Sequence, residues 1–183
     1  MCAAPGGKTS YIAGLMQDHG EIVALDRYES RLHVLSKNIK RLGLKSIRPL
    51  VMNAMEYNRK DFDRILVDAP CSGTGTLSKK PDIKWKVNLL DIKKLSELQF
   101  SLLSKASTLL KKDGVLVYST CSIEPEENFE VVKKFLESNP NFKLLSAEES
   151  VSKELVDENG CISTLPHIHQ LDGAFAAKLI RIE

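Results

Sequence analysis

Two short apolar runs, each followed at once by a polar loop with a cysteine, most constrain the fold of this chain. The first is Ile65-Leu66-Val67, which leads to Asp68 and Cys71. The second covers residues 115–118 and leads to Cys121. Such runs are typical of strands buried on both faces of a parallel sheet, and these strands deliver their last residues to the edge where open α/β folds bind ligands. The pattern therefore predicts that both thiols lie at that edge.

Strand and helix patterns alternate along the rest of the chain. We expect strands at residues 21–26, 47–52, 63–68, 115–118, 142–145 and 173–180, and helices at 9–18, 29–42, 96–111 and 124–137. Leu98 and Leu102 should face inward on the third helix, residues 112–114 should form the turn after it, and residues 173–180 should be an edge strand. This alternation predicts an α/β fold with a doubly wound, mostly parallel sheet, built by residues 1–183 as one domain.

Composition excludes several classes of protein. With 43% apolar residues in 183, the chain can bury a sizeable core, but its apolar runs are too short for a membrane span or a signal peptide. Its four cysteines lack the spacing of zinc or redox motifs, so we expect no metal site and a reduced, cytoplasmic protein. The formal net charge of +2 is too small to indicate a partner.

Residues 2–9 contain a glycine turn before the first predicted helix. Small residues let backbone N–H groups approach a ligand, and a helix N-terminus favours an anionic group such as a carboxylate. An ATP-binding P-loop is excluded, because Cys2 stands where that motif requires its first glycine. Asp26 ends a strand about 20 residues further on, which suits a ribose diol or, alternatively, the N-cap of the next helix. Asn53 ends the following strand and suits contact with an adenine edge.

A lysine-rich segment follows Cys71. Residues 79–94 hold six lysines, two aspartates and Trp85. Basic side chains around an aromatic ring suit a polyanion with bases that stack. The alternative is a solvated helix start in which Trp85 is a core residue.

Four motifs occur together in an order that resembles one enzyme family. They are Cys2-Ala3-Ala4-Pro5-Gly6-Gly7-Lys8-Thr9, Asp68-Ala69-Pro70-Cys71-Ser72-Gly73, Tyr118-Ser119-Thr120-Cys121-Ser122 and Pro125-Glu126-Glu127-Asn128. The set resembles the Nop/Sun family of RNA cytosine-5 methyltransferases, which use S-adenosylmethionine (SAM) and have a Rossmann-like class I methyltransferase fold. The resemblance covers essentially the whole chain, and Pro81-Asp82-Ile83-Lys84-Trp85 is most similar to the bacterial ribosomal-RNA branch.

The resemblance implies roles for these residues. Cys121 adds to carbon 6 of cytosine, which makes carbon 5 electron-rich. Cys71 assists loss of the carbon 5 proton and release of Cys121, while Asp68 bonds the N3/N4 edge of the base and Lys8 contacts the base. The implied cofactor-binding residues are Cys2, Ala3, Ala4, Pro5, Gly6, Gly7, Lys8, Asp26, Arg31, Asn53 and Asp68. The implied partner is ribosomal or transfer RNA with a single-stranded or flipped-out cytosine, bound by a monomer.

The chain departs from the family pattern in three places. Asn53 stands where the family has an acid, and Ala174 stands where a second aromatic is usual. The chain also begins inside the SAM motif, so the resemblance implies that it lacks a central strand, between those ending at Asp26 and Asp68, and the N-terminal RNA-binding region. We therefore expect a fragment of a longer enzyme; the alternative is an RNA-binding remnant without activity.

The cysteines also allow other interpretations. Each one taken singly fits a small buried apolar residue. DNA cytosine-5 methyltransferases use a Pro-Cys thiol like that of Pro70-Cys71 as their nucleophile, which would reverse the roles of Cys71 and Cys121.

Overall fold

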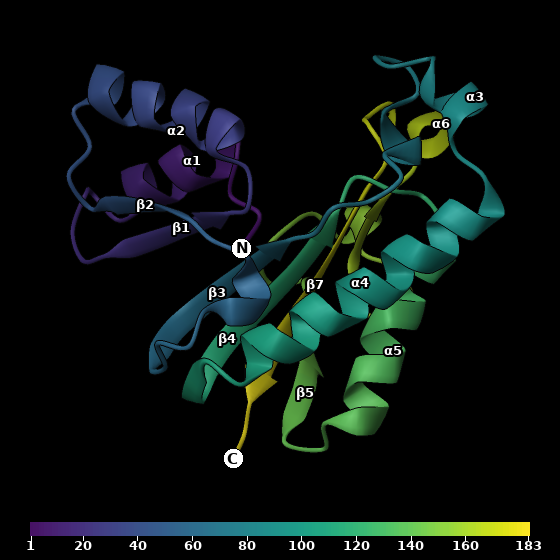
Figure 1. Ribbon diagram of the computed structural model, residues 1–183. Coiled ribbons are helices and arrows are strands. Elements are labelled where there is room, and N and C mark those ends of the chain that lie inside the picture. The colour runs from purple at the N-terminus through teal and green to yellow at the C-terminus, as the bar shows by residue number, and fades with distance from the viewer. The chain divides into compact units, whose positions relative to one another are not determined.

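The computed structural model describes residues 1–183, which form two compact units, Met1–Asn58 and Arg59–Glu183. Each unit has a β-sheet of its own, covered by helices (Figure 1). None of the helices combines the length and the hydropathy that a membrane crossing requires.

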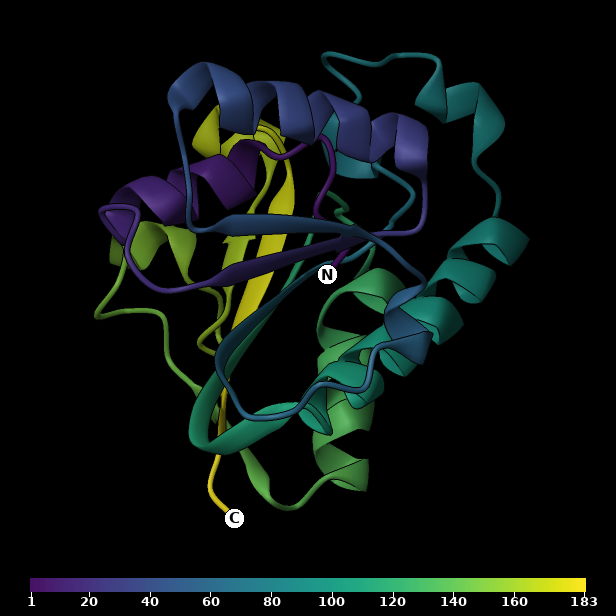
Figure 2. The same cartoon turned by 60° about the vertical axis from the view of Figure 1, so that its left-hand side comes forward.

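The first unit packs two helices on a two-stranded parallel sheet. β1 (Ile22–Asp26) and β2 (Ile47–Val51) pair so that their carboxyl ends coincide. α1 (Gly7–Leu15) and α2 (Glu29–Leu42) lie on one face of this pair (Figures 1 and 2). The core they share contains Ala13, Ala24, Leu32, Leu35 and Ile47. The predicted bounds of α2 are confirmed, because Gly43 adopts the left-handed conformation (φ 68°) that ends a helix.

The second unit is built on a five-stranded sheet in the order β3-β4-β7-β5, with β6 also paired to β7. The strands are β3 (Phe62–Asp68), β4 (Leu110–Thr120), β5 (Phe142–Leu145), β6 (Ile162–Thr164) and β7 (Ala174–Arg181). β3 and β4 are parallel, whereas β7 is antiparallel to β4, β5 and β6, so β7 alone runs against the other strands.

The prediction that the last strand is an edge strand is wrong. β7 lies between β4 and β5, and its alternate residues Phe175, Ala177 and Leu179 are buried. Conversely β3, predicted to be buried on both faces, has Val67 as its single buried residue.

Helices α4 (Leu89–Ser107) and α5 (Phe129–Ser138) lie side by side on one face of this sheet (Figures 1 and 2). Their buried apolar residues are Ile92, Leu102, Leu103, Ala106, Val131, Val132 and Phe135. Burial of each leucine or phenylalanine contributes about 1.5–3 kcal/mol. α4 begins earlier than predicted because Asn88 and Asp91 form a capping box, and Leu98, predicted to face inward, is 39% exposed.

Irregular elements account for other differences from the prediction. Residues 112–114 lie inside β4, where Asp113 adopts φ 60° and the pairing with β3 shifts register, which marks a β-bulge. The remaining short elements, with η for a 3₁₀ helix, are η1 (Ala54–Glu56), η2 (Thr74–Thr76), α3 (Ile83–Lys86), η3 (Pro125–Glu127), η4 (Lys153–Leu155) and α6 (Pro166–His169).

Candidate active site

Cys71 and Cys121 lie against each other beyond the carboxyl ends of β3 and β4. The parallel register pairs Asp68 with Ser119, so the loops that follow the two strands leave the sheet at the same edge. The two Sγ atoms are 3.1 Å apart, and the Cys121 amide donates a hydrogen bond to Cys71 Sγ at 3.3 Å. The prediction that both thiols lie at the carboxyl edge of the sheet is confirmed. Cys121 is exposed and Cys71 is half-buried, so Cys121 is the more accessible of the pair.

The neighbouring thiol influences the ionisation of Cys71. The hydrogen bond with Cys121, and then burial, raise the pKa of the Cys71 thiol far above its ordinary value. Negative charge on Cys121 raises it further. Cys71 is therefore a neutral thiol at pH 7 while Cys121 lies beside it.

Asp68 ends β3 at the same edge of the sheet as the two thiols. Its Oδ1 accepts a hydrogen bond from Ser119 Oγ at 2.9 Å, and the ladder continues from the Ala69 amide to Ser119 O at 2.8 Å. These bonds hold the carboxylate at the carboxyl edge of the sheet. Asp68, Cys71 and Cys121 thus all lie at the carboxyl edge of β3 and β4, as predicted from the strand ends.

A buried carboxylate joins the two cysteine loops. Glu127 is fully buried and accepts hydrogen bonds from the Ser72 amide (2.8 Å), Ser122 Oγ (2.6 Å) and Gln99 Nε2 (3.0 Å). It also accepts a hydrogen bond from Ser72 Oγ. Ser72 directly follows Cys71, and Ser122 directly follows Cys121. One carboxylate therefore fixes the neighbour of each thiol, and its four donors satisfy the bonds that a buried charge requires.

The sequence did not reveal this network. Glu127 was predicted to lie in the first turn of a helix, but it ends η3, and α5 begins at Phe129. Its partner Ser72 is 55 positions away, so no local pattern signals the contact. One available signal was Gln99, a polar residue on the side of α4 that carries the buried Leu102 and Leu103.

Gly75 brings a third loop against Cys121. Its amide donates to Cys121 O at 3.0 Å, and its carbonyl accepts from the Gly173 amide at 2.7 Å. A Cβ at Gly75 would lie 2.1 Å from Gly173 O and 2.8 Å from Cys121 O, and neither backbone atom can move freely. The position therefore requires glycine.

In the first unit, the residues implied for SAM binding gather at the carboxyl end of β1. The Ala3 amide donates to Leu25 O at 2.8 Å, and the Ala4 amide donates to Asp26 Oδ2 at 3.2 Å. Arg31 Nη2 donates to Ala4 O at 3.0 Å, and Arg31 Nη1 lies 3.9 Å from Asp26 Oδ2. The loop from Cys2 to Gly6 is therefore tied to the end of the strand.

Gly6 gives this loop its shape. It adopts φ 107° immediately before α1, and a Cβ there would lie 2.4 Å from Leu35 Cδ1. The small residues that precede α1 leave backbone N–H groups at a helix N-terminus, which suits the carboxylate of SAM. Backbone N–H donors before α1 therefore match the negatively charged carboxylate of SAM in chemical type.

Other predicted contacts with the cofactor and the base are less direct. The Asp26 side chain is only 2% exposed and also accepts from the Tyr28 amide at 3.1 Å, so it holds the loop and the entry to α2. Asn53 is exposed, and its Oδ1 accepts from the Met55 amide at 3.2 Å. Lys8 is exposed on α1. The roles of these residues toward ribose, adenine and cytosine stay predictions.

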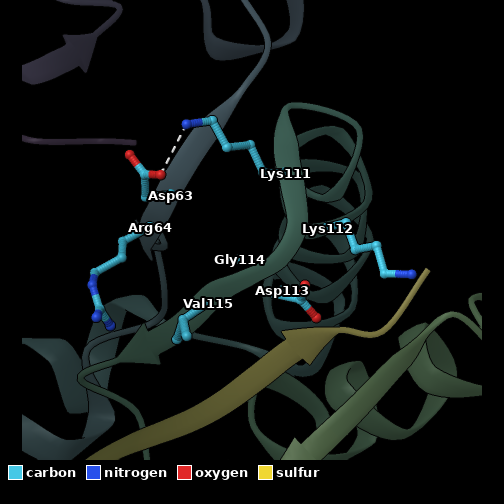
Figure 3. Close-up of a pocket in the computed structure, with 7 residues that line it drawn as sticks. All are labelled: Asp63, Arg64, Lys111, Lys112, Asp113, Gly114 and Val115. Atoms are coloured by element: carbon cyan, nitrogen blue, oxygen red, sulfur yellow. Dashed lines mark hydrogen bonds and ion pairs between the residues drawn. The ribbon is translucent and has the colours of Figure 1, made fainter.

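A pocket of about 260 Å³ is separate from the thiol cluster (Figure 3). It lies at the opposite ends of β3 and β4, around the bulge, and an ion pair of 2.9 Å between Lys111 and Asp63 crosses it. Both ion-pair residues are substantially exposed, so the pair contributes little stability. The pocket includes no residue that the sequence implied for catalysis.

Comparison with known proteins supports the interpretation of the motifs. The family described as 16S rRNA methyltransferase RsmB/F matches residues 1–180. The probable ribosomal RNA small subunit methyltransferase B of Bacillus subtilis (strain 168) is 38% identical over 185 residues, which cover 97% of this chain and 41% of that protein. The ribosomal RNA small subunit methyltransferase B of Vibrio vulnificus (strain YJ016) is 42% identical over 183 residues, covering 98% and 41%.

Solved structures agree with this match. The crystal structure of NSun6 from Pyrococcus horikoshii with SFG is 36% identical, has a TM-score of 0.89, and is matched over 100% of this chain and 47% of that chain. The fold is therefore an α/β methyltransferase fold. The chain spans about two fifths of the length of the curated relatives it matches: it covers 41% of the Bacillus protein and 41% of the Vibrio protein. Over that span, the chain belongs to the RsmB/F (Nop/Sun) family of ribosomal RNA cytosine methyltransferases.

Proposed function

We propose that this chain transfers a methyl group from SAM to carbon 5 of a cytosine in 16S ribosomal RNA. The observation that carries the proposal is the pair of thiols 3.1 Å apart at the sheet edge where β3 ends in Asp68. The names of the bacterial relatives support the small ribosomal subunit as the source of the substrate; transfer RNA is the second candidate. We further propose that residues 1–183 act as one catalytic domain, as a monomer and in the cytoplasm.

Cys121 is the proposed nucleophile because it is the exposed thiol of the pair. As a thiolate it forms a bond to carbon 6 of cytosine, and the electron pair of the 5,6 double bond becomes available at carbon 5. Asp68 hydrogen-bonds the N3/N4 edge of the base and thereby orients the cytosine toward Cys121. Lys8 is assigned a contact with the same base. When bound, SAM supplies the methyl group that carbon 5 takes up.

Cys71 is the proposed proton acceptor in the second half of the reaction. Once Cys121 is bonded to carbon 6, its hydrogen bond and charge no longer raise the pKa of Cys71, and burial is the main remaining cause. Cys71 therefore loses its own proton to solvent more readily at this stage, and its thiolate then takes the proton from carbon 5. The electrons of that C–H bond restore the double bond and expel Cys121 as a thiolate.

The residues implied for SAM binding are Cys2, Ala3, Ala4, Pro5, Gly6, Gly7, Lys8, Asp26, Arg31, Asn53 and Asp68. The small-residue loop before α1 would hold the carboxylate of the cofactor, and the end of β1–β2 would hold its ribose and adenine. We also propose the doubly wound sheet with a further central strand. This proposal rests on the family resemblance; β1 pairs with β2, and β3 pairs with β4 in the other sheet.

Covalent adducts test the roles of the two thiols. The chain, SAM and transcribed 16S rRNA are incubated, denatured and resolved on a gel that separates free protein from protein–RNA complexes. Cys71→Ala should accumulate a covalent complex, because Cys121 adds but is not released. Cys121→Ala and the double variant should form none. The reverse pattern would assign the nucleophile to Cys71, as in DNA methyltransferases. RNA binding without an adduct in any variant would favour the inactive remnant.

A further inference from the structure

Trp85, the single tryptophan of the chain, is a surface residue. Its side chain is 82% exposed, and Leu89 and Leu90, which follow it, are 80% and 70% exposed. The interpretation of Trp85 as a core residue is therefore wrong. Large apolar side chains gathered in water are uncommon on a monomer and mark surfaces that bind something.

Positive charge flanks this tryptophan in the sequence. Lys80, Lys84 and Lys86 are all exposed, and the Lys84 ammonium lies 5.3 Å from the centre of the Trp85 ring. The only carboxylate paired with these three lysines is Asp82, which lies 3.7 Å from Lys86 with both side chains exposed. Most of the positive charge on this segment is therefore available to an anionic partner.

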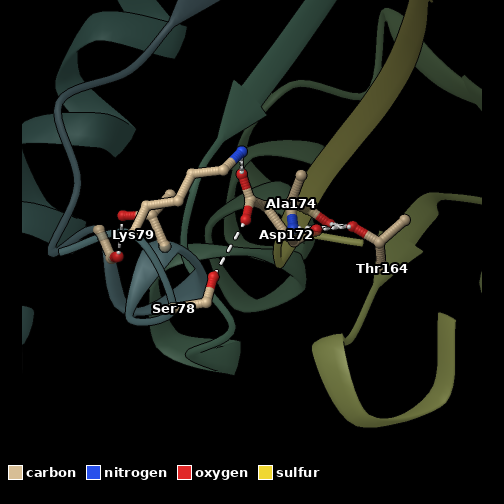
Figure 4. Close-up of polar contacts among 7 residues, drawn as sticks. Ser78, Lys79, Thr164, Asp172 and Ala174 are labelled. Carbon is tan, nitrogen blue, oxygen red and sulfur yellow. Dashed lines mark hydrogen bonds and ion pairs between the residues drawn. The ribbon is translucent and has the colours of Figure 1, made fainter. Parts of the chain in front are cut away.

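The start of the segment is fixed beside the thiol cluster. Gly75, bonded to Cys121 O, lies four residues before Lys79, and the Lys79 and Lys80 amides both donate to Thr76 O. The Ser78 hydroxyl and the Lys79 ammonium both bind the Asp172 carboxylate, at 3.3 and 2.5 Å (Figure 4). Lys79 holds the pKa of Asp172 below its ordinary value, so this anchor is charged at neutral pH. The loop that follows Cys71 is therefore held by hydrogen bonds at residues 75–80, directly before the exposed residues 84–90.

We propose that Lys80, Lys84, Trp85, Lys86 and Leu89, here called the lysine–tryptophan face, bind the single-stranded RNA next to the target cytosine, with one base stacked on Trp85. Lysines neutralise phosphates, and an aromatic ring accepts any base on its face. The inference rests on the proposed function, because the chemistry at Cys121 requires an unstacked cytosine and hence unpaired neighbours. A protein partner would use the leucines but has no need of the concentrated positive charge.

Fluorescence tests the face directly because Trp85 is the sole tryptophan. Titration of the chain with a short single-stranded oligoribonucleotide of 16S rRNA sequence should quench Trp85 emission. With the same RNA carrying a dye, anisotropy should show Trp85→Ala binding roughly tenfold more weakly, in the range expected for loss of one stacked base, and Trp85→Phe recovering most of the affinity. Lys84→Ala should lower the slope of log K against log salt by about one.

The exposed Lys133 on α5 supplies the matched control. Lys133→Ala removes the same charge outside the face and should leave the affinity unchanged. RNA binding with constant Trp85 emission, or unchanged affinity in Trp85→Ala, would overturn the proposal, as would absence of RNA binding. Shielding of Trp85 that grows with protein concentration in the absence of RNA would show that a second copy of the chain covers this face, and would overturn the proposal too. The covalent adduct of Cys71→Ala tests the proposed reaction independently of Trp85. If that adduct forms while Trp85→Ala binds RNA with unchanged affinity, the proposal for the lysine–tryptophan face is refuted and the proposed function is not.

Discussion

Removal of the Glu127 carboxylate should loosen the two cysteine loops together. In Glu127→Ala, the Ser72 amide loses the acceptor it has in the structure, in a region where Ser72 is 9% exposed and Ser122 is 1% exposed. The other donors retain alternatives. Ser72 Oγ and Ser122 Oγ are 3.2 Å apart and can bond each other, and Gln99 Nε2 keeps the Pro70 carbonyl at 2.9 Å.

The expected loss of stability follows from these contacts. One buried donor without a partner costs about 1–3 kcal/mol, and each hydrogen bond that is exchanged for a weaker one costs about 0.5–1 kcal/mol. Release of a buried charge offsets part of this sum. Glu127→Ala should therefore lower the free energy of unfolding by about 2–4 kcal/mol. Glu127→Gln should cost about 1 kcal/mol, since hydroxyls can turn to accept from the new amide.

Urea unfolding followed by circular dichroism measures this loss, with Glu126→Ala as the control because Glu126 is exposed. The thiols supply a second readout. In a Cys2→Ser background, dibromobimane fluoresces when it bridges Cys71 and Cys121, and bridging should slow in Glu127→Ala but not in Glu126→Ala. Equal stability of the Glu127 and Glu126 variants, or equal bridging rates, would refute the idea that this carboxylate positions both loops.

Two other predictions concern the thiols and the cofactor loop. The hydrogen bond with Cys121 is the largest cause of the raised pKa of Cys71, so Cys121→Ala should lower that pKa. Peptide mapping by mass spectrometry should then show that Cys71 reacts with iodoacetamide at lower pH than in the parent chain. An unchanged pH profile of this reaction would contradict the coupling between the two thiols. Calorimetry should show saturable SAM binding that Gly6→Ala abolishes, because the added Cβ meets Leu35. Gly14→Ala on α1 is the matched control and should leave SAM binding unchanged, because no atom lies within 4 Å of a Cβ there and Gly14 is not among the residues implied for SAM binding. If the parent chain binds no SAM until an N-terminal extension supplies a strand, the pocket requires the longer protein.

Local sequence patterns predicted much of what places the thiols. The apolar runs before Cys71 and Cys121 form parallel strands in register, so the meeting of the two loops followed from strand direction alone. α2 ends at Gly43 as predicted, because a glycine after an amphipathic pattern is a local signal. The start of α4 also has a local signal, because Asn88 and Asp91 have the spacing of a capping box. This signal marks the helix start although the hydrophobic pattern of residues 89–95 is weak.

The features that local sequence patterns did not predict depend on residues far away in the chain. β7 is an interior strand because β5 and β6 pair along one of its sides and β4 along the other, and nothing within residues 174–181 encodes those neighbours. Glu127 is the same case within the site. Its own segment resembles an ordinary helix start, but Ser72, Ser122 and Gln99 converge on it from three other parts of the chain. Short-range pattern thus predicts which residues reach the carboxyl edge of the sheet, whereas the spacing of the two thiols at 3.1 Å depends on long-range bonds that only the folded chain brings together.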